Sequence, residues 1–532
     1  MRTFKNNKIN IKPILFFLTT NHRSGFNSQL TAMATMMTKM MSISSAMSSS
    51  SSPSPSPPQP SAQSLSTQSP PSPSLPLRTI PGSYGWPLLG PISDRLDYFW
   101  FQGPETFFRK RIDKYKSTVF RTNIPPSFPF FSGVNPNVVA VLDCKSFAHL
   151  FDMEIVEKRD VLVGDFKPSS NFTGNVRTCA YLDPSEPQHA KVKNFALDIL
   201  KRSSKVWLTE LLANFDILWE KVDNDISEKG SSSYIFLLQQ SIFKFLTKAL
   251  VGADPSNSPE IEKNGFAMLD RWLALQLLPT VHIGVAQPLE EMFLHSFAYP
   301  SFLVSGDYKK LVQFIKKEGK EVVQRGETEF GLSEEETIHN LLFVLGFNAF
   351  GGFSVFLPIL IGTIASDTTG LQERLRKEAR ENGGPSLTFH SVIEMPLVQS
   401  VVYETLRLNP PVPLQYARAR KDFELSSHES VYNIKKGELL CGYQSLVMRD
   451  PKIFDEPESF KPERFMGQGR ALLSHLYWSN GPQTESPSAS NKQCAAKDYV
   501  PLTACLILAH MFRRYDSITG SSSSITAVQK AK

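Results

Sequence analysis

Cys494 has the side chain best suited to bind a metal ion in this chain of 532 residues. It ends a polar loop rich in Ser and Pro, 479–493, and precedes an apolar run, 500–511, that predicts a helix. A thiol at a helix N-terminus is expected to have a lowered pKa, because the positive end of the helix dipole favours the thiolate; Lys492 and Lys497 would act in the same direction. A thiolate on a rigid loop suits a soft metal such as haem iron. A lone cysteine is more often a packing residue, so other features of the sequence are needed to show whether Cys494 binds a metal.

The segment 337–356 is apolar nearly all round and predicts a long helix through the middle of the protein. The pattern from Ser333 to Glu336 is a capping box that marks its start. Its centre, 346–354, holds three glycines and Asn348. Each glycine costs about 1 kcal/mol in a helix, so a large group is expected close to the backbone. A buried amide costs about 1–3 kcal/mol unless it is bonded. Two interpretations stay open: a helix-packing notch in which Asn348 bonds to the backbone, or a cofactor face in which Asn348 points at a polar ligand.

Two pairs of charged residues have helical spacing. His189 and Lys193 are four residues apart, so they share one helix face and could bind a single anion. They could equally form a solvated face with no function. Glu404 and Arg407 are three apart and can form an ion pair, which on a surface contributes little to stability.

Composition narrows the class of protein. A hydrophobic content of 41% is ample for a core, and a net charge of +6 without any dense block of Lys and Arg gives no sign of nucleic-acid binding. The five cysteines are odd in number and widely spaced, which indicates a reducing compartment rather than a disulfide framework. They are Cys144, Cys179, Cys441, Cys494 and Cys505.

Residues 1–74 have the composition of a transit peptide followed by a Ser/Pro-rich linker. No Asp or Glu occurs before Asp94, and Ser, Thr, Met and basic residues dominate. This composition points to a plastid, or less strongly to a mitochondrion; a disordered tail and a later start at Met33 or Met36 are the alternatives. The apolar run 14–18 is too short to cross a bilayer.

The elements between these features are mostly helical. Helices are predicted over 107–115, 207–222, 235–251, 371–380 and 397–408, and strands over 118–122, 138–142 and 437–442. The segment 289–304 is rich in apolar residues and predicts a membrane contact, a substrate entrance or ordinary core. Pro501 lies inside the last apolar run, where the helix either kinks or restarts.

The order of four motifs resembles that of the haem-thiolate cytochromes P-450. These are Glu404-x-x-Arg407, Arg449-Asp450-Pro451, Phe460-x-Pro462-Glu463-Arg464-Phe465 and Cys494. The resemblance covers 75–532 as one catalytic domain. It implies a mainly α fold with small β-sheets (α+β), with haem between a long central distal helix and a proximal cysteine loop. Cys494 would be the axial thiolate ligand of haem b (iron protoporphyrin IX), and Glu404, Arg407 and Arg464 a structural triad behind it.

Differences from the usual motifs of the cytochromes P-450 indicate which branch of that superfamily the chain resembles. Members that activate O₂ carry an acidic residue and a threonine in the distal helix, whereas this chain has Ser354 and Val355 there, and valine cannot deliver a proton. The loop before Cys494 is longer than usual, and no membrane anchor is expected. The motifs 491–494, 346–352 and 181–189 are similar to those of the plant enzymes that act on fatty-acid hydroperoxides: allene oxide synthases, hydroperoxide lyases and divinyl ether synthases.

This resemblance implies chemistry without O₂, NADPH or a reductase, because the substrate, a polyunsaturated fatty-acid hydroperoxide, already contains the O–O bond that haem iron cleaves homolytically. Asn348 would contact the hydroperoxide and, with Cys494, act in catalysis. The haem propionates would be held by four basic residues, Lys158, His189, Lys193 and Lys492.

Two substrate-binding positions separate the branches. Allene oxide synthases usually have Phe where this chain has Leu162, and Lys where it has Ser354. The resemblance therefore favours a lyase that splits 13-hydroperoxides into a six-carbon aldehyde and a twelve-carbon oxo-acid. The alternatives are an allene oxide synthase, a divinyl ether synthase, an O₂-dependent monooxygenase and a non-catalytic haem-binding protein. The expected location is the chloroplast, with peripheral membrane contact through 289–304.

Overall fold

A mixed sheet forms at one end of the molecule from strands that are far apart in the sequence. The computed structural model describes residues 75–127, 130–131, 133–282 and 289–531, so the transit peptide and linker predicted over 1–74 lie outside the described residues. The sheet has the order β1-β2-β7-β4-β3, with β2 and β7 parallel and the other pairs antiparallel. Its strands are β1 (Val119–Asn123), β2 (Asn137–Val141), β3 (Val156–Glu157), β4 (Leu414–Ala419) and β7 (Leu439–Tyr443). The three predicted strands therefore correspond to β1, β2 and β7.

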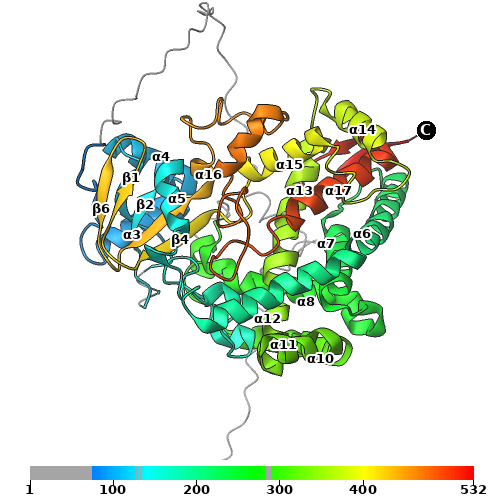
Figure 1. The fold of residues 1–532 in the computed structure, drawn as a ribbon, viewed down its shortest axis with the longest axis horizontal. Coiled ribbons are helices and arrows are strands. Elements are labelled where there is room, and N and C mark those ends of the chain that lie inside the picture. The colour runs from blue at the N-terminus through cyan, green and yellow to red at the C-terminus, as the bar shows by residue number, and fades with distance from the viewer. Residues whose placement is uncertain (1–74, 128–129, 132, 283–288, 532) are drawn as a thin grey trace, which may run out of the picture.

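Two antiparallel hairpins complete the β structure. They are β5 (Phe423–Ser426) with β6 (Val431–Ile434), and β8 (Tyr515–Gly520) with β9 (Ile525–Lys530). Figure 1 shows α3 (Leu89–Leu96), α4 (Pro104–Tyr115) and α5 (Cys144–Ala148) around the large sheet, with the longer helices making up the rest of the protein. The predicted mainly α fold with small sheets is confirmed.

The longer helices surround one central helix. They are α6 (Pro187–Lys229), α7 (Ile235–Leu246), α8 (Pro259–Leu277), α10 (Ser305–Glu318), α11 (Lys320–Phe330), α14 (Leu371–Asn382), α15 (Pro396–Leu408) and α17 (Tyr499–Arg514). Two further helices are short, α9 (Leu289–Phe293) and α16 (Gln444–Val447), and α12 (Glu334–Phe343) and α13 (Gly351–Ala365) belong to the central helix itself. The single helix α6 includes both the predicted helix start near His189 and the predicted helix 207–222.

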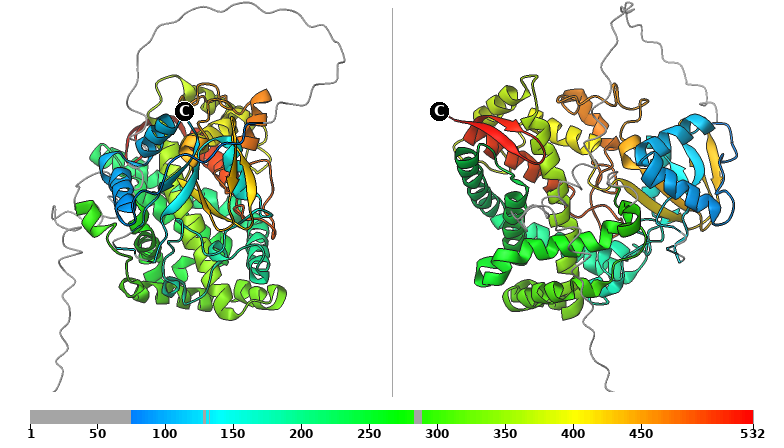
Figure 2. Two further views of the ribbon diagram at one scale, coloured as in Figure 1. Left: turned by 90° about the vertical axis from the view of Figure 1, so that its left-hand side faces the viewer. Right: turned by 180° about the vertical axis from the view of Figure 1, so that it is seen from behind.

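The central helix runs without a break from Glu334 to Ala365, through α12, a π-helical segment (Val344–Phe350) and α13. It begins at the predicted capping box: Glu336 N–H donates to Ser333 Oγ (3.2 Å), and Ser333 N–H donates to a Glu336 carboxylate oxygen (2.9 Å). Its 32 residues are long and apolar enough to cross a membrane, but 72% of its most apolar stretch is buried, as in the core helix of a folded domain. Figure 2 shows it passing through the middle of the molecule.

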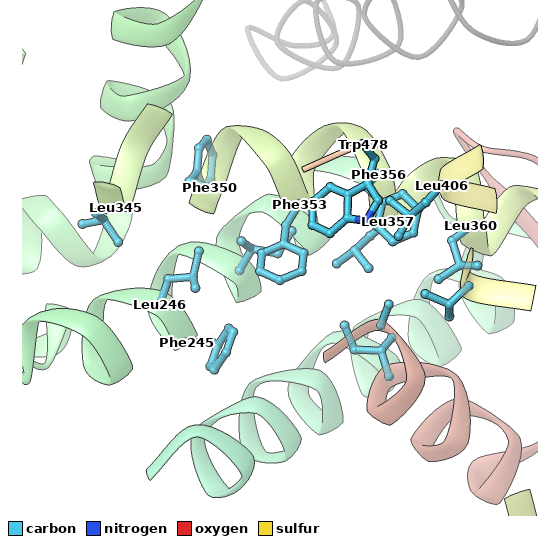
Figure 3. Close-up of a cluster of buried hydrophobic side chains, with 14 of the residues drawn as sticks. Phe245, Leu246, Leu345, Phe350, Phe353, Phe356, Leu357, Leu360, Leu406 and Trp478 are labelled. Carbon is cyan, nitrogen blue, oxygen red and sulfur yellow. The ribbon is translucent and has the colours of Figure 1, made fainter. Parts of the chain in front are cut away.

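Buried side chains from several elements pack on this helix. Figure 3 shows Phe353, Phe356, Leu357 and Leu360 of α13 in one cluster with residues from α7, α15 and the segment before Cys494. The residues from those elements include Phe245, Leu246, Leu406 and Trp478. The core thus joins the central helix to the beginning of the cysteine loop.

The C-terminal helix α17 accommodates its proline without a kink. It starts at Tyr499, so Pro501 is its third residue. The first N–H groups of a helix have no partner within it, and a proline in the first turn therefore removes no helical hydrogen bond. Of the two expectations for Pro501, the structure selects a helix that starts close to it.

Candidate functional site

The loop that carries Cys494 is fixed by hydrogen bonds across its two ends. Cys494 N–H donates to the carbonyl oxygen of Ser479 (2.8 Å). Gln493 Nε2 donates to the carbonyl oxygen of Pro482 (2.6 Å), and Gln493 itself is buried. A backbone held in this way keeps the sulfur in one place, as a metal ligand requires.

The Cys494 thiol is not acidified in the way the sequence predicted. Burial raises its pKa, although Lys193 and the backbone N–H two residues further on act in the opposite direction. Helix α17 begins only at Tyr499, so the dipole end lies beyond the thiol. Lys492 Nζ donates to backbone carbonyls, and Lys497 Nζ donates to the Gln483 carbonyl (2.7 Å). The prediction of a lowered pKa is wrong for the thiol alone. Coordination of a metal ion, which deprotonates a thiol directly, would have to favour the thiolate.

Four basic residues lie close together beside this loop, as their mutual effects on pKa show: Lys158, His189, Lys193 and Lys492. Among the described residues, no carboxylate oxygen lies within 4.0 Å of a side-chain nitrogen of any of the four. The Asp183 carboxylate accepts from the Lys158 backbone N–H (2.7 Å), and its charge acts to raise the pKa of Lys158, His189 and Lys492. The hydrogen-bond partners of the four side chains are neutral: Asn480 Oδ1 for Lys158, the Gln493 carbonyl for Lys193, the Cys179 and Leu182 carbonyls for Lys492, and the Ala489 carbonyl for His189 Nδ1. His189 Nε2 is buried and has no partner.

Burial lowers the pKa of each member of this basic cluster, and repulsion from a neighbouring lysine lowers it further for Lys158, His189 and Lys492. Burial, with the nearby Lys492, lowers the pKa of Lys158 to about 7, and burial with Lys193 lowers that of Lys492 to about 8. Burial, with both lysines beside it, lowers the pKa of His189 to about 4. Asp183 alone does not balance three buried or half-buried lysines, and buried cations that are not balanced are costly, so this cluster fits a ligand that carries more than one negative charge. A solvated face without function, the alternative considered for His189 and Lys193, is excluded because both are buried.

The central helix is accessible at Asn348, in its π-helical segment, and partly at Gly352, just after that segment. Asn348, Gly352, Val355 and Ile359 are spaced as on one side of a helix, but Val355 and Ile359 are buried. Asn348 is exposed, and a methyl group added at Gly352 would meet no atom within 4 Å. The Asn348 side chain makes no hydrogen bond to any described residue, so the prediction of a buried amide bonded to the backbone is wrong. An open face in the middle of a buried helix leaves room for a ligand, and π-helical turns often occur at such sites.

The other two glycines of this helix have a packing role. A methyl group at Gly346 would lie 2.9 Å from Leu269 Cδ2 and 3.0 Å from a ring carbon of Trp272, and one at Gly351 would lie 2.6 Å from Leu273 Cδ2. All three neighbours belong to α8. The packing notch is therefore present at Gly346 and Gly351, but without the expected bond from Asn348 to the backbone. Gly352 leaves the helix surface open, and a cofactor face there stays a prediction.

This division predicts opposite effects for two alanine substitutions. Gly346→Ala should lower the free energy of unfolding by about 1–3 kcal/mol, because α8 would have to move. Gly352→Ala should leave stability unchanged or raise it by about 1 kcal/mol, since alanine favours a helix, while altering ligand binding on the open face. Urea unfolding and absorption spectra of the two purified variants provide the comparison; equal destabilisation by both would contradict an open face at Gly352.

Leu162 and Ser354 were predicted to bind substrate. Leu162 lies in a turn, where its N–H donates to the Gly164 carbonyl (3.3 Å), and its side chain packs against the main core. Ser354 is buried in α13, and its hydroxyl has no partner among the described residues. No hydrogen bond among the described residues joins either of them to Asn348, so their role in binding stays a prediction.

The structure brings the triad Glu404, Arg407 and Arg464 together. Arg407 Nε lies 2.7 Å from Glu404 Oε2, and Arg464 Nε lies 3.0 Å from Glu404 Oε1. All three side chains are buried. Arg407 Nη1 also donates to the carbonyls of Met448 (2.9 Å) and Pro457 (2.7 Å). The expectation of a weak surface pair for Glu404 and Arg407 alone is therefore wrong: the pair ties α15 to the segment that leads to the cysteine loop.

Sequence reasoning missed Asn480 as a member of the site. Its Oδ1 accepts from Lys158 Nζ, and its Nδ2 donates to the Lys492 carbonyl (2.8 Å), so it links two members of the basic cluster. Asn480 has a φ of 62°, a left-handed conformation that asparagine tolerates better than most residues. The turn pattern Ser479-Asn480-Gly481-Pro482 was the available signal.

Comparison with known proteins adds an independent result. The cytochrome P450 family model matches residues 364–482. The chain is 64% identical over 463 residues to the fatty acid hydroperoxide lyase, chloroplastic, of Solanum lycopersicum, which covers 86% of this chain and 97% of the relative. It is 63% identical to the linolenate hydroperoxide lyase, chloroplastic, of Arabidopsis thaliana, over 86% of this chain and 94% of the relative. It is 43% identical to the allene oxide synthase, chloroplastic, of Linum usitatissimum, over 86% of this chain and 87% of the relative.

Proposed function

Because the chain belongs to the cytochrome P450 family, among the fatty acid hydroperoxide lyases and allene oxide synthases, we propose that it is a fatty acid hydroperoxide lyase. It cleaves 13-hydroperoxides of linolenic and linoleic acid into a six-carbon aldehyde and a twelve-carbon oxo-acid. The observation that carries this proposal is the identity of 64% to a lyase along nearly the whole relative, against 43% to an allene oxide synthase. Leu162 and Ser354, which differ from the usual synthase residues, support the same branch.

The family implies a haem iron bound by a cysteine thiolate, and haem b is the proposed form. The site fits this group on two counts: the side-chain nitrogens of the basic cluster have no carboxylate within 4.0 Å among the described residues, and no atom lies within 4 Å of a methyl group added at Gly352 beside Asn348. Cys494 would ligate the iron, and Lys158, His189, Lys193 and Lys492 would neutralise the propionates. When bound, haem supplies the homolytic cleavage of the substrate's O–O bond.

The protein's own groups would bind and orient the hydroperoxide. The Asn348 carboxamide has free donors and an acceptor that can hydrogen-bond to the peroxide oxygens. Val355 offers no proton at the position where O₂-activating relatives carry a donor, which suits a reaction that needs no proton delivery to dioxygen. Leu162 and the Ser354 hydroxyl would border the substrate chain.

Substitution of Lys158 by Met tests the propionate site. Without haem, the variant should be as stable as the parent or more stable, because a buried cation beside Lys492 is removed. The affinity of the variant for haem should be about 10–100-fold lower than that of the parent, the loss typical of groups that support a metal centre. Haem titration followed by absorbance gives the affinity; unchanged affinity would remove Lys158 from the haem site. Lys145→Met, at an exposed lysine on α5, is the control.

Product analysis tests the function. Purified protein loaded with haem should convert 13-hydroperoxylinolenic acid into hexenal and a twelve-carbon oxo-acid without NADPH. An α-ketol as the sole product would identify an allene oxide synthase, and a divinyl ether would identify a divinyl ether synthase. Turnover only with NADPH and O₂ would indicate a monooxygenase, and unchanged hydroperoxide absorbance a non-catalytic haem-binding protein.

The named location of the relatives is the chloroplast, and we place this chain there, with 1–74 as transit peptide and linker and 75–532 as the catalytic domain. Peripheral membrane contact through 289–304 is part of the proposal. Large apolar side chains are exposed in this segment: Met292, Phe293, Phe297, Phe302 and Leu303. Exposed groups of this kind mark contact surfaces. Phe297→Ser with Phe302→Ser should reduce co-sedimentation with lipid vesicles.

A further inference from the structure

A groove of about 410 Å³ lies at the sheet end of the molecule, away from the residues of the candidate site. It is bordered by the segment 83–88 and the α3 helix that follows it, by the outer face of α4 and by β1, and Figure 1 shows α3, α4 and β1 together. Its lining is polar and includes Ser83, Tyr84, Asp97, Gln102 and Thr122. Nothing in the proposed lyase reaction uses these residues.

The charged side chains of this groove that form no ion pair among the described residues are basic. Arg111 pairs with Asp94 (2.5 Å) and Asp97 (3.3 Å), and Arg121 pairs with Glu438 (2.9 Å). Lys110 and Lys114 also line the groove, and among the described residues neither has a carboxylate within 4.0 Å. They are four residues apart on α4, so they share one face and can contact one anion.

A rim of exposed apolar side chains borders the same groove. Gly85 and Gly90 line it, and the turn between them exposes Trp86 (79%), Leu88 and Leu89. Leu88 has a φ of 66°, a costly conformation for a leucine that directs this turn outward. Asp97 and Gln102 also line the groove, and the π-helical segment Asp97–Phe101 that begins at Asp97 exposes Trp100 and Phe101 (68%).

This rim is fixed to the segment for which membrane contact is proposed. Arg95 of α3 is buried, and its Nη2 donates to the His295 carbonyl (2.8 Å) while its Nε donates to Glu291 (2.5 Å). The Phe99 ring stacks on the His295 ring with centroids 3.7 Å apart. The segments 86–101 and 289–304, which carry these exposed apolar residues, are therefore in direct contact through Arg95 and Phe99.

We propose that this groove binds the anionic headgroup of a membrane lipid. Lys110 and Lys114 contact the anion, and Trp86, Leu89 and Phe101 enter the boundary between headgroups and acyl chains, where aromatic side chains are stabilised. Free basic side chains beside exposed apolar ones match a lipid, which presents both chemistries at once, better than a soluble anion. The proposal rests on the membrane contact included in the proposed function and adds a lipid preference to it.

Co-sedimentation of the full-length, haem-loaded protein with vesicles tests this inference. We expect stronger binding to phosphatidylcholine vesicles that contain phosphatidylglycerol than to phosphatidylcholine alone. Lys110→Gln with Lys114→Gln should weaken binding to the anionic vesicles by about 30-fold, since each basic residue near an anionic surface contributes about fivefold. The matched control is Lys201→Gln with Lys205→Gln, an exposed pair four residues apart on α6. Lyase activity on dispersed substrate should stay unchanged in both double variants.

The vesicle-binding results also show which part of the proposal is wrong, if any. If both double variants lost binding to anionic vesicles equally, the proposed headgroup site in the groove would be wrong, and only a diffuse effect of surface charge would remain. No preference for anionic vesicles would overturn the headgroup site while membrane contact through Phe297 and Phe302 survives. Competition by soluble glycerol phosphate as effective as that by lipid would show a site for a free phosphate compound instead. If no vesicle binds, the membrane contact itself fails, and the lyase proposal is unaffected.

Discussion

Replacement of Cys494 by Ser should abolish lyase activity and the absorption band that marks carbon monoxide bound to a ferrous haem–thiolate. A serine hydroxyl does not replace a thiolate as a ligand for haem iron. Loss of a group that merely supports a metal ligand costs about 10–100-fold, so loss of the ligand itself should exceed about 100-fold. Activity with 13-hydroperoxylinolenic acid and spectra of the reconstituted variant provide the two measurements.

Cys179 is the matched control for this substitution, because it also retains accessible surface and lies near Lys193 and Lys492. Cys179→Ser should keep both the band and the activity. The opposite pattern, with Cys179→Ser losing the thiolate band and Cys494→Ser keeping it, would move the iron ligand to Cys179. Retention of the band in both variants would exclude a cysteine ligand at either position.

The sequence predicted the elements well where a local pattern determines them. The capping box at Ser333 starts the central helix as expected, and the predicted strand 118–122 corresponds to β1, Val119–Asn123. Capping and alternation are short-range effects, so a single sequence contains them in full. The order of the motifs from Glu404 to Cys494 indicated the family for a similar reason, since each motif is local.

Predictions that depended on packing were less successful. Asn348 is exposed because a π-helical segment, which hydrophobic periodicity does not distinguish from α-helix, orients it. Burial raises the pKa of Cys494, and the two features expected to lower it are displaced by tertiary contacts: α17 begins five residues later, at Tyr499, and the side chains of Lys492 and Lys497 donate to backbone carbonyls. Burial of the basic cluster was missed for the same reason: lysines on a helix are usually solvated, and only the fold shows that these are enclosed.

The same packing explains why the site tolerates unfavourable electrostatics. The basic cluster costs free energy, yet its lysines are bound by backbone carbonyls and by Asn480 of the cysteine loop, and that loop is closed by Gln493. Rigid neighbours hold the charges together for a ligand that offsets their repulsion. We therefore expect the haem-free protein to be the less stable form, because a ligand that binds only the folded state stabilises it.

Glu404→Gln should lower the free energy of unfolding by about 3–5 kcal/mol, the cost of breaking a buried ion pair by removing one partner. Both Arg407 and Arg464 would keep their charge in a buried place without the carboxylate that now lies within 3.0 Å of each. A glutamine can accept only some of their hydrogen bonds. Urea unfolding of the haem-loaded protein, followed by circular dichroism, measures the change.

Glu463→Gln is the control for this prediction, because Glu463 is next to Arg464 in sequence but pairs with Arg374 on the surface. This substitution should lower the free energy of unfolding by less than about 1 kcal/mol. A double variant of Glu404→Gln with Arg464→Met should cost less than the sum of the single changes, since both remove the same interaction. Equal, small effects of Glu404→Gln and Glu463→Gln would contradict a buried triad that anchors α15 to the segment before the cysteine loop. Strict additivity in the double variant would show that Arg464 is held by the carbonyls of Asp455 and Ser459, to which it also donates, rather than by Glu404.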